Sequence, residues 1–581
     1  MCGIAGIVRY GAPPDDARVA RMQRALAHRG PDGSGLERLG AACLAHTRLA
    51  LVDLAGGRQP MRTRDGRYTI TYNGEVYNHG ELRAELRERF DFASACDTEV
   101  VLAAYVTWGE AALARLNGMF AFFVWDAERE RGFAARDRLG VKPFAYTFSD
   151  GELAFASEAK ALVGPRPRAH AESILEYLSA PCFSGVEHSM FDGIDYLQPG
   201  SLLRVSRDGL ELERWWDWPL DARDGGGDHA AELRARVESA VARSLRADVP
   251  VGLYLSGGLD STLIAAVAAR ESRPRAFTVE FEDQGAFDYA RSTIVVSDDR
   301  PFAALAAESL AVERELCLVP RAGLARDLAA LAHINDALPA WEQELAQHHL
   351  AAAAARHVKA VLVGDAADET HWGYHFLLDD QATRDPAGIL RRFGGVPIRR
   401  EVLADPRAHF AAKYRALMAA GGARWDTPPE RRRATTYLIV KRWLPRLLHN
   451  GDIHAMARSL EARVPFADVE LLAAAERVPP EIGLRDGVEK WALREAARGL
   501  VPEPIRARKK SALPKDQRAQ ACWQQAARAA LDESPLVRAF VDAAAVRALC
   551  DPARALDEAE RAALFRVAAL GHWAAHYEVV A

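Results

Sequence analysis

A glycine-containing hexapeptide near the middle of the chain has the residue types of a phosphate site. Ser256-Gly257-Gly258-Leu259-Asp260-Ser261 follows an apolar run at 251–255 and opens an alanine-rich helical stretch. A strand, a glycine turn and a helix start place backbone N–H groups around an anion, and glycines let the backbone approach a phosphate closely. The stretch is neither a P-loop nor a dinucleotide fingerprint. A tight turn without function is the alternative interpretation, but the serine and the aspartate favour a phosphate and metal site.

The second stretch that could do chemistry is the N-terminus, where Cys2 follows Met1. After removal of Met1, Cys2 would carry both a thiol and a free α-amine. An α-amine titrates near pH ~8 and a thiol near ~8.5, so the amine can take the thiol proton at neutral pH. Because a cysteine at position 2 also occurs by chance, this residue alone does not establish a nucleophile.

Length and composition limit the class of protein. A chain of 581 residues is too long for one core, so we expect two or more domains. A net charge of −5 gives no electrostatic reason to expect nucleic acid or a membrane as partner. Seven widely spaced cysteines without a Cys-x-x-Cys motif predict reduced thiols in a cytoplasmic protein. The N-terminus lacks the features of a signal peptide, and the apolar runs fall short of a membrane span.

The segments that follow Cys2 make its role specific. Polar motifs occur in a fixed order at 28–33, 46–49, 72–79, 97–100, 136–143 and 157–160. Together with the N-terminal Cys2-Gly3-Ile4-Ala5-Gly6, they resemble the class II glutamine amidotransferases, which are N-terminal-nucleophile glutaminases. The resemblance covers residues 2 to about 160. It implies an N-terminal-nucleophile four-layer sandwich, with L-glutamine as substrate.

Hydrolysis of a side-chain amide requires a nucleophile, a base and an oxyanion hole. The resemblance assigns the nucleophile to Cys2 and the oxyanion hole to the Asn73 amide and the Gly74 N–H. It assigns the substrate carboxylate to Arg48, whose fork suits a carboxylate. The remaining predicted glutamine ligands, for the α-ammonium, are Glu75 and Asp97. Without the other motifs, Arg48 and Asp97 would each be interpreted as part of a surface ion pair. Two departures, Cys96 for a common serine and Gly33 for a common aspartate, should not remove activity.

The second half predicts a parallel sheet. Apolar runs at 276–281 and 358–363 follow the first strand at βαβ spacing, so helices should cover both faces. Ligands on such sheets bind at the carboxyl ends of the strands. The loops after 255, 281 and 363 should therefore converge, which brings Asp260 and Asp368 near one phosphate chain. Two carboxylates there suit Mg²⁺.

This half resembles the ATP pyrophosphatases, and within them the synthetase domain of glutamine-dependent asparagine synthetases. The match includes 459–466 and 487–495. The resemblance implies a doubly wound parallel-sheet domain with a helical C-terminal part, and Lys490 as the residue that stabilises charge on the carboxylate or on pyrophosphate. A helix-surface lysine is the alternative interpretation of Lys490. It implies ATP and Mg²⁺ as cofactors, with Asp260 and Asp368 as metal ligands. The predicted ATP-binding residues are Leu255, Ser256, Gly257, Gly258, Asp260, Ser261, Val279, Val363 and Gly364.

Three departures from the asparagine synthetase pattern fall around the predicted acceptor pocket. The loop at 363–369 replaces a serine by valine, a glutamate by Asp365 and a glycine by alanine. Trp372 stands where a glycine is common. Carboxylates stand in the segment 339–344, where groups suited to aspartate are expected, and like charges oppose a dicarboxylate. The predicted acceptor pocket consists of Trp341, Glu342, Glu344, Asp365 and Trp372.

The implied reaction has two halves. A carboxylic acid attacks the α-phosphate of ATP, and ammonia made at Cys2 passes through an internal channel and displaces AMP to leave an amide. The departures favour an acceptor other than free aspartate, and a divergent asparagine synthetase is the alternative. A ring-closing β-lactam-synthetase-like enzyme and a non-catalytic scaffold are rival interpretations. The retention of Cys2, Arg48, Asn73, Gly74 and Asp97 argues against the first rival. The retention of Cys2 and Asp260 argues against the second.

We place the predicted domain boundary near residue 205, which gives a glutaminase domain at 1–205 and an adenylating domain at 206–581. The segment Asp221 to Asp228, with three successive glycines, predicts a linker or exposed loop. A homodimer is one candidate assembly, and the sequence does not decide it.

Overall fold

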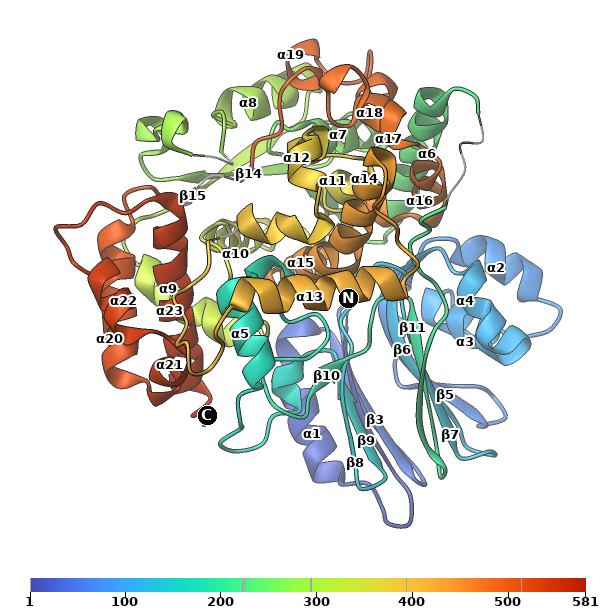
Figure 1. Ribbon diagram of the computed structural model, residues 1–581. Helices are drawn as coiled ribbons and strands as arrows, with labels where there is room; N and C mark the ends of the chain where they lie inside the picture. Colours follow the sequence, from blue (N-terminus) through green and yellow to red (C-terminus); the bar gives the residue numbers. More distant parts are fainter. Residues whose placement is uncertain are drawn as a thin grey trace.

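The computed structural model describes residues 2–221, 224, 226–292, 295–392, 394–513 and 515–580. The N-terminal part consists of two antiparallel sheets, shown in blue to cyan at the bottom of Figure 1. Within the described residues the first sheet has the order β10-β8-β9-β1-β3-β2 and the second has the order β12-β11-β7-β6-β5-β4. The strands of the first sheet are β1 (Gly3–Arg9), β2 (Gly33–Leu39), β3 (Ala42–Arg48), β8 (Ala145–Ser149), β9 (Glu152–Ala156) and β10 (Asp195–Tyr196). Those of the second are β4 (Met61–Arg62), β5 (Tyr68–Val76), β6 (Gly118–Asp126), β7 (Arg131–Arg136), β11 (Ser201–Ser206) and β12 (Gly209–Arg214).

The two-residue period of β1 explains how these sheets form layers. Ile4 and Val8 point into the core between the sheets, together with Phe123 of β6. Ile7 points the other way, into a core with Val19 of α1 (Asp16–Ala25). Helices α2 (His79–Leu86) and α3 (Asp97–Trp108) cover the outer face of the second sheet. The order is therefore helix, sheet, sheet, helix, and the predicted four-layer sandwich is confirmed.

The C-terminal part is built on a parallel sheet with the order β15-β14-β13-β16-β17. Its strands are β13 (Val251–Tyr254), β14 (Ala276–Phe281), β15 (Arg314–Val319), β16 (Ala360–Leu362) and β17 (Glu461–Arg463). Strand β13 pairs in parallel with β14 on one side and with β16 on the other. The chain order reverses at this point, and ligands of open α/β sheets bind at such a crevice. The loops after β13 and β16 both leave from it.

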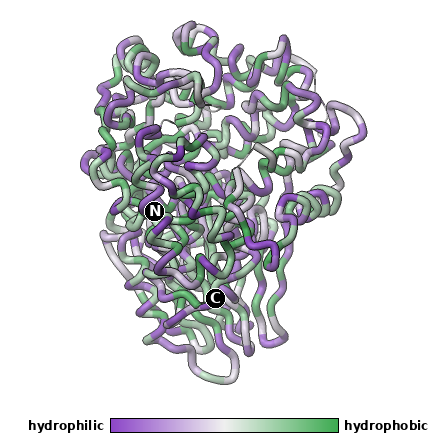
Figure 2. Tube along the Cα trace, turned by 60° about the vertical axis from the view of Figure 1, so that its left-hand side comes forward, coloured by the Kyte–Doolittle hydropathy of each residue, from purple (hydrophilic) through white to green (hydrophobic). Residues whose placement is uncertain are grey.

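Helices cover both faces of this sheet, as predicted. In Figure 1, α6 (His229–Ser244), α7 (Leu259–Glu271) and α8 (Arg300–Ser309) lie above the sheet. Helices α10 (Gln343–Ala354) and α15 (Leu444–Met456) lie below it and contact each other. A further helical group, shown in red, contains α20 (Gln520–Glu533), α21 (Pro535–Phe540), α22 (Ala543–Leu549) and α23 (Glu558–His576), and it packs on α9 (Leu324–Ile334). Figure 2 shows hydrophobic and hydrophilic residues mixed along the trace of both parts. No helix within the described ranges has the length and apolar character that crossing a bilayer requires.

The remaining helices connect these layers. They are α4 (Ala112–Arg115), α5 (Ala171–Ser179), α11 (Ala367–Thr370), α12 (Asp380–Thr383), α13 (Pro406–Ala420), α14 (Pro428–Leu438), α16 (Val469–Glu476), α17 (Pro480–Gly483), α18 (Trp491–Ala496) and α19 (Glu503–Arg506). Helix α15 lies at the junction of the two parts. Its Asp452 accepts a hydrogen bond from Arg29 at 2.7 Å, and the Lys142 ammonium lies 3.3 Å from the same carboxylate. Both cations are fully buried, so a charged network joins the N-terminal part to the C-terminal part.

The boundary predicted near residue 205 lies inside β11. Strand β11 pairs with β7, and β12 pairs with β11 along its whole length to Arg214. We therefore propose that the first domain extends to Arg214. The glycine-rich segment 221–228 that predicts a linker lies partly outside the described residues.

Two candidate active sites

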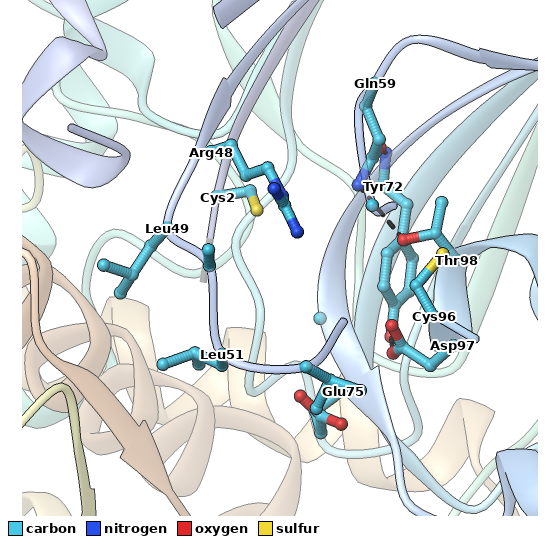
Figure 3. A pocket seen from close by; sticks show the side chains of 14 residues that line it. Cys2, Arg48, Leu49, Leu51, Gln59, Tyr72, Glu75, Cys96, Asp97 and Thr98 are labelled. Atoms are coloured by element: carbon cyan, nitrogen blue, oxygen red, sulfur yellow. Dashed lines mark hydrogen bonds between the residues drawn. The ribbon is translucent and has the colours of Figure 1, made fainter. Parts of the chain in front are cut away.

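A pocket in the N-terminal part collects Cys2 and three of the residues predicted to bind glutamine, Arg48, Glu75 and Asp97 (Figure 3). They come from the residue before β1, the end of β3, strand β5 and the start of α3. The pocket is lined by Cys2, Arg48, Leu49, Ala50, Leu51, Val52, Gly57, Gln59, Tyr72, Gly74, Glu75, Cys96, Asp97 and Thr98. Segments separated by up to 96 residues in sequence therefore meet in one pocket.

Asn73 holds Cys2 at the edge of this pocket. The backbone N–H of Cys2 donates to Asn73 Oδ1 at 3.0 Å, and Arg29 Nε donates to the Cys2 carbonyl at 3.0 Å. Among the described residues, Asn73 Nδ2 is buried without a partner, which leaves a donor for an oxyanion. Burial raises the pKa of the Cys2 thiol, so thiolate formation needs a base, and the α-amine of a processed Cys2 would be the nearest one.

Gly74 is required by the close approach of two strands. It pairs with Phe120 of β6, and a Cβ built on it would lie 2.4 Å from the Met119 carbonyl oxygen. A larger residue would push β5 away from β6 at the point where Asn73 and Gly74 meet the pocket. Glycine at position 74 is therefore explained by the lack of room for a side chain between the two strands.

The two carboxylates of the pocket have different partners. Asp97 Oδ2 accepts from the Tyr72 hydroxyl at 2.6 Å and from the Val76 N–H at 3.0 Å. Glu75 Oε2 lies 3.2 Å from Nη2 of Arg463, which belongs to β17 of the C-terminal part. Burial raises the pKa of both carboxyl groups, and for Glu75 the nearby Asp97 raises it further. Within the described residues Asp97 has no salt-bridge partner, as suits a site for a substrate ammonium.

Arg48 points into the pocket from the end of β3 (Figure 3). Its guanidinium donates to the carbonyls of Asp53 at 2.7 Å and Leu54 at 2.9 Å. A Cβ on Gly57 would lie 2.7 Å from its Nη2. The loop that closes this side of the pocket is thus folded around the Arg48 side chain, and the guanidinium is held in place before substrate arrives.

The second site lies at the carboxyl ends of β13 and β16. Ser256 and Ser261 are joined through their hydroxyl groups at 3.1 Å. Gly257 has φ +71°, and a Cβ there would lie 2.3 Å from the Ala303 backbone nitrogen, so a glycine is needed. Gly258 is the N-cap of α7 and supplies no side-chain cap. The first N–H groups of α7 consequently remain available to an anion.

Lys490 joins the two predicted metal ligands. Its Nζ lies 2.5 Å from Asp260 Oδ2 and 2.6 Å from Asp368 Oδ1, and Lys510 lies 2.6 Å from Asp368 Oδ2. Burial by itself raises the pKa of Asp368, but Lys490 and Lys510 together lower it to about 2. Lys490 precedes α18 with φ +55°, in the left-handed region that costs a non-glycine residue energy. Lys490 is thus buried between two carboxylates and does not lie on a helix surface.

The other residues predicted for ATP lie around the same crevice. A Cβ on Gly364 would lie 3.3 Å from Asp260 Cβ, which places the β16 loop against the start of α7. The Val363 N–H donates to the Arg463 carbonyl at 2.9 Å. Leu255 and Val279 are buried, Leu255 directly after β13 and Val279 within β14. The strands bring the predicted nucleotide-binding residues of β13 and β16 together.

A metal ion fits this crevice on chemical grounds. Asp260 Oδ1 is buried and has no hydrogen-bond partner in the described part of the chain. No group of three or more His, Cys, Asp or Glu side chains suited to a metal occurs among the described residues. Two carboxylates without a complete protein cage are what Mg²⁺ uses when substrate phosphates supply the other ligands.

The five residues predicted for the acceptor pocket lie in four different surroundings. Asp365 lies in the β16 loop, close to Gly451 of α15; burial raises its pKa to about 6, although Lys510 opposes this. Trp341 lies 5.7 Å from the Arg566 guanidinium of α23. Glu342 is buried, which raises its pKa to about 7, with Lys515 and Arg561 nearby. Both thus face the C-terminal helical group.

Two of these residues, Glu344 and Trp372, have partners away from the phosphate crevice, and their place in an acceptor pocket stays a prediction. Glu344 Oε1 accepts from the Ala340 N–H at 2.7 Å, and Oε2 accepts from Asn335 at 2.8 Å and lies 3.2 Å from His454. Its carboxylate thus accepts hydrogen bonds from the backbone that precedes α10. Trp372 has φ +61°, and its indole N–H donates to the Val478 carbonyl at 3.1 Å. The ring occupies an apolar pocket with Leu233, Ala475, Val478, Gly483, Ala492 and Leu493, so the bulk that replaces glycine lies in the core.

Sequence reasoning missed the basic loop 508–510. Lys510 contacts Asp368, and Arg508 donates to the Gly257 carbonyl at 3.2 Å and pairs with Asp299. The signal was present as three consecutive basic residues, Arg508-Lys509-Lys510. Its contacts could not be predicted, because they join residues that are far apart in the sequence. No local pattern indicates which of the two lysines contacts Asp368.

Comparison with known proteins divides the chain in the same way. The family described as a glutamine amidotransferase domain matches residues 1–216, and the family described as asparagine synthase matches residues 232–575. Glutamine-hydrolyzing asparagine synthetase 3 of Bacillus subtilis is 33% identical over 554 residues, which cover 89% of this chain and 87% of that protein. Glutamine-hydrolyzing asparagine synthetase 1 of the same organism is 28% identical and covers 88% and 87%. Amidase chyE of Penicillium rubens is 28% identical and covers 87% of both chains.

Proposed function

The chain belongs to the glutamine-hydrolysing asparagine synthetase family, and from this premise we propose how its two sites make an amide from glutamine, ATP and a carboxylic acid. The first domain, residues 1–214 in our proposal, releases ammonia from glutamine. The second domain activates the acid with ATP. The overall products are glutamate, AMP, pyrophosphate and an amide.

In the first half-reaction, the Cys2 thiolate attacks the side-chain amide of glutamine. The α-amine of processed Cys2 takes the thiol proton and returns it to the leaving ammonia. The free Nδ2 of Asn73 and the Gly74 N–H stabilise the oxyanion. Arg48 binds the substrate carboxylate, and Glu75 with Asp97 binds the α-ammonium. Water then releases glutamate from the thioester. The buried amide donor of Asn73 is the observation that best supports this assignment.

In the second half-reaction, the acid oxygen attacks the α-phosphate of ATP and pyrophosphate leaves. The Ser256 loop and the N-terminus of α7 hold pyrophosphate. Asp260 and Asp368 would hold Mg²⁺, which when bound neutralises phosphate charge. Lys490 stabilises the negative charge that develops between the acid and the α-phosphate, and Lys510 neutralises Asp368 while the nucleotide enters. Ammonia then attacks the acyl carbon and AMP leaves.

Transfer of ammonia between the sites requires a protected path. Ammonia in water at neutral pH is mostly ammonium, which is not a nucleophile. The buried junction around Arg29, Lys142 and Asp452 separates Cys2 from the β16 loop without an exposed gap at these side chains. We propose that ammonia moves through this junction along α15, whose Gly451 approaches Asp365.

The surroundings of the predicted acceptor residues bear on the choice of acid. Trp372 and Glu344 have partners elsewhere, so two of the departures that argued against aspartate no longer do so. Asp365 remains near the phosphate site, and a carboxylate there opposes a second acceptor carboxylate when both are ionised. We propose a carboxylic acid acceptor, with a mono-acid or an amine-bearing acid preferred over free aspartate, in a specialised biosynthetic pathway.

The finer assignments rest on indirect support. The seven cysteines are free, which supports a reducing compartment such as the cytoplasm. The homodimer remains a prediction. Mg²⁺ as the metal is supported by the two-carboxylate crevice.

The test of the proposed function is an acceptor screen. Purified protein with confirmed Met1 removal receives ATP, Mg²⁺, glutamine and one acid at a time, and AMP, pyrophosphate and glutamate are measured. We expect AMP release with an acid other than aspartate. Robust AMP release at sub-millimolar aspartate would contradict the acceptor proposal while leaving the amidotransferase intact. Absence of glutamate release from glutamine would contradict the function itself.

A further inference from the structure

The motif at 459–466 has no role in the mechanism described above, yet it reaches the glutamine pocket. Its Arg463 is the last residue of β17 and is fully buried. The residue belongs to the parallel sheet of the C-terminal part. Its guanidinium nevertheless lies 3.2 Å from Glu75 Oε2, across 388 residues of sequence. A wall of the glutamine pocket is therefore supported by the other domain.

The Arg463 guanidinium is held on every side. Nε lies 2.5 Å from Glu461 Oε1, and Nη1 donates to the carbonyls of Ser244 at 2.8 Å and Arg246 at 2.7 Å. The remaining Nη2 faces Glu75. Such a planar fork loses little conformational freedom when it binds, and its direction is fixed before substrate arrives. A lysine could not make the same set of contacts.

The glutamine pocket needs a cation at this point. Glu75 and Asp97 are both buried and line the same pocket, so ionising one disfavours ionising the other. Asp97 is stabilised by the Tyr72 hydroxyl and a backbone N–H. Arg463 is the side-chain cation that pairs with Glu75 in the described part of the chain. Burial and the nearby Asp97 raise the pKa of Glu75, while Arg463 lowers it. Removal of Arg463 would therefore leave Glu75 more readily protonated and without the partner that orients it.

We propose that Arg463 is a positioning residue of the glutamine site: it favours the ionised form of Glu75 and aims that carboxylate at the α-ammonium of glutamine. This inference rests on the proposed function, because it takes Glu75 as a ligand of that ammonium. The Arg463 carbonyl also accepts a hydrogen bond from the N–H of Val363, which lies at the start of the loop after β16. The same residue thus links the glutamine pocket to the strand that ends at the ATP site.

The experiment compares glutamine with glutaramate, its analogue that lacks the α-amine. Hydrolysis of both amides is measured for wild type, Arg463→Met and Arg463→Lys. For Arg463→Met we expect KM for glutamine to rise at least tenfold, with kcat changed less than threefold. Glutaramate hydrolysis should change less than threefold, because that substrate has no ammonium to bind. KM of the variant for glutamine should fall as pH rises, since higher pH restores the Glu75 carboxylate. Arg463→Lys should recover part of the loss.

The matched control is Arg243→Met. Arg243 makes a bidentate pair with Asp468 at 2.9 Å, and Asp468 also contacts Asn117 of the N-terminal part. It is a domain-junction arginine that does not line the glutamine pocket. We expect both substrates to be hydrolysed as by wild type. If Arg463→Met does not fold, Arg463→Met/Glu461→Gln, which also removes the second buried charge, replaces it with the same expectations.

The outcomes separate this inference from the proposed function. If wild type hydrolyses glutamine but Arg463→Met changes glutamine and glutaramate equally, or changes neither, the positioning role is overturned. If wild type with a free N-terminal cysteine hydrolyses neither substrate, the glutaminase function fails, and with it the basis of the inference.

Discussion

The glutamine pocket and the ATP site each contain two buried carboxylates, but the two pairs are neutralised differently. In the ATP site, Lys490 lies between Asp260 and Asp368, and Lys510 pairs with Asp368 as a second cation. In the glutamine pocket, as far as the chain is described, Glu75 pairs with one arginine, and Asp97 accepts from a hydroxyl and a backbone N–H. The carboxylates of the ATP site are paired with lysines of the protein. In the glutamine pocket, negative charge remains that a substrate ammonium can neutralise.

This difference follows the charges of the ligands. Glutamine brings an ammonium and a carboxylate, so in our proposal Glu75 and Asp97 bind the ammonium opposite Arg48, and acids without an amine bind more weakly. ATP brings several negative charges, so its site must hold lysines that can turn from aspartate to phosphate when the nucleotide enters. Each site thus presents charges opposite to those of the substrate groups that it is proposed to bind.

The largest expected effect separates the two sites. Cys2→Ala removes the nucleophile, so glutamate release should fall by about 10⁴-fold or more. AMP formation with ammonium chloride as nitrogen source should stay within threefold of wild type. Cys96→Ser, which changes the other pocket thiol, should keep both activities. Loss of the ammonia-dependent reaction in Cys2→Ala would mean that the sites are not separable.

The reverse separation is expected from Lys490→Met. This change leaves Asp260 and Asp368 close together without the ammonium that joins them, and it removes positive charge from the reacting phosphate. Acid-dependent AMP formation should fall by about 10³-fold. Glutamate release should remain, because Lys490 is in the C-terminal domain and contacts neither Glu75 nor Cys2. A variant with full AMP formation would return Lys490 to a structural role.

A smaller effect should distinguish the two lysines of the ATP site. Lys510→Met removes one charge-assisted contact to Asp368 and should lower kcat/KM for ATP about tenfold. Lys509, the exposed neighbour in the same basic run, provides the control, and Lys509→Met should leave ATP kinetics unchanged. Equal losses in both variants would indicate a general effect of loop charge instead of a specific contact.

The smallest expected effect is a difference in pH response. Burial raises the pKa of Glu75 and Asp97 above the usual carboxylate value of ~4, so protonation begins at a higher pH than usual. The pKa of Asp368 is lowered to about 2, because the two lysines outweigh its burial. As pH falls from 8 to 5.5, KM for glutamine should rise while KM for Mg-ATP stays nearly constant. Parallel pH profiles for the two substrates would remove the electrostatic distinction.

The sequence predicted the glutamine pocket more completely than the ATP site. Its residues lie within the first 98 positions, in motifs whose turn and strand chemistry is local, and the structure brings Cys2, Arg48, Gly74, Glu75 and Asp97 into one pocket. The βαβ spacing predicted the parallel sheet, and the family resemblance implied the N-terminal sandwich. The contacts of Lys510, Arg508 and Arg463 could not be predicted, because they cross long stretches of chain and depend on how the domains dock.

Side-chain direction was the other limit. Trp372 replaces a small residue, and its volume suggested a filled acceptor pocket. The positive φ at this position instead turns the indole toward Gly483, where a Cβ would lie 2.1 Å from the ring. Glu344 shows the same limit in charge: its carboxylate accepts backbone N–H groups before α10. The residue type at these two positions indicates the available chemistry, but the direction of each side chain depends on the backbone conformation.

The central claim is that nitrogen released at Cys2 is consumed at the Ser256 loop of the same molecule. It is tested by supplying glutamine labelled with ¹⁵N in the side-chain amide, together with ATP, Mg²⁺, the acid that supports AMP release and an excess of unlabelled ammonium. The account predicts a product amide that carries mainly ¹⁵N, with glutamate, AMP and amide formed in equal amounts. Product that carries mainly unlabelled nitrogen, or glutamate release with no labelled amide, would contradict it.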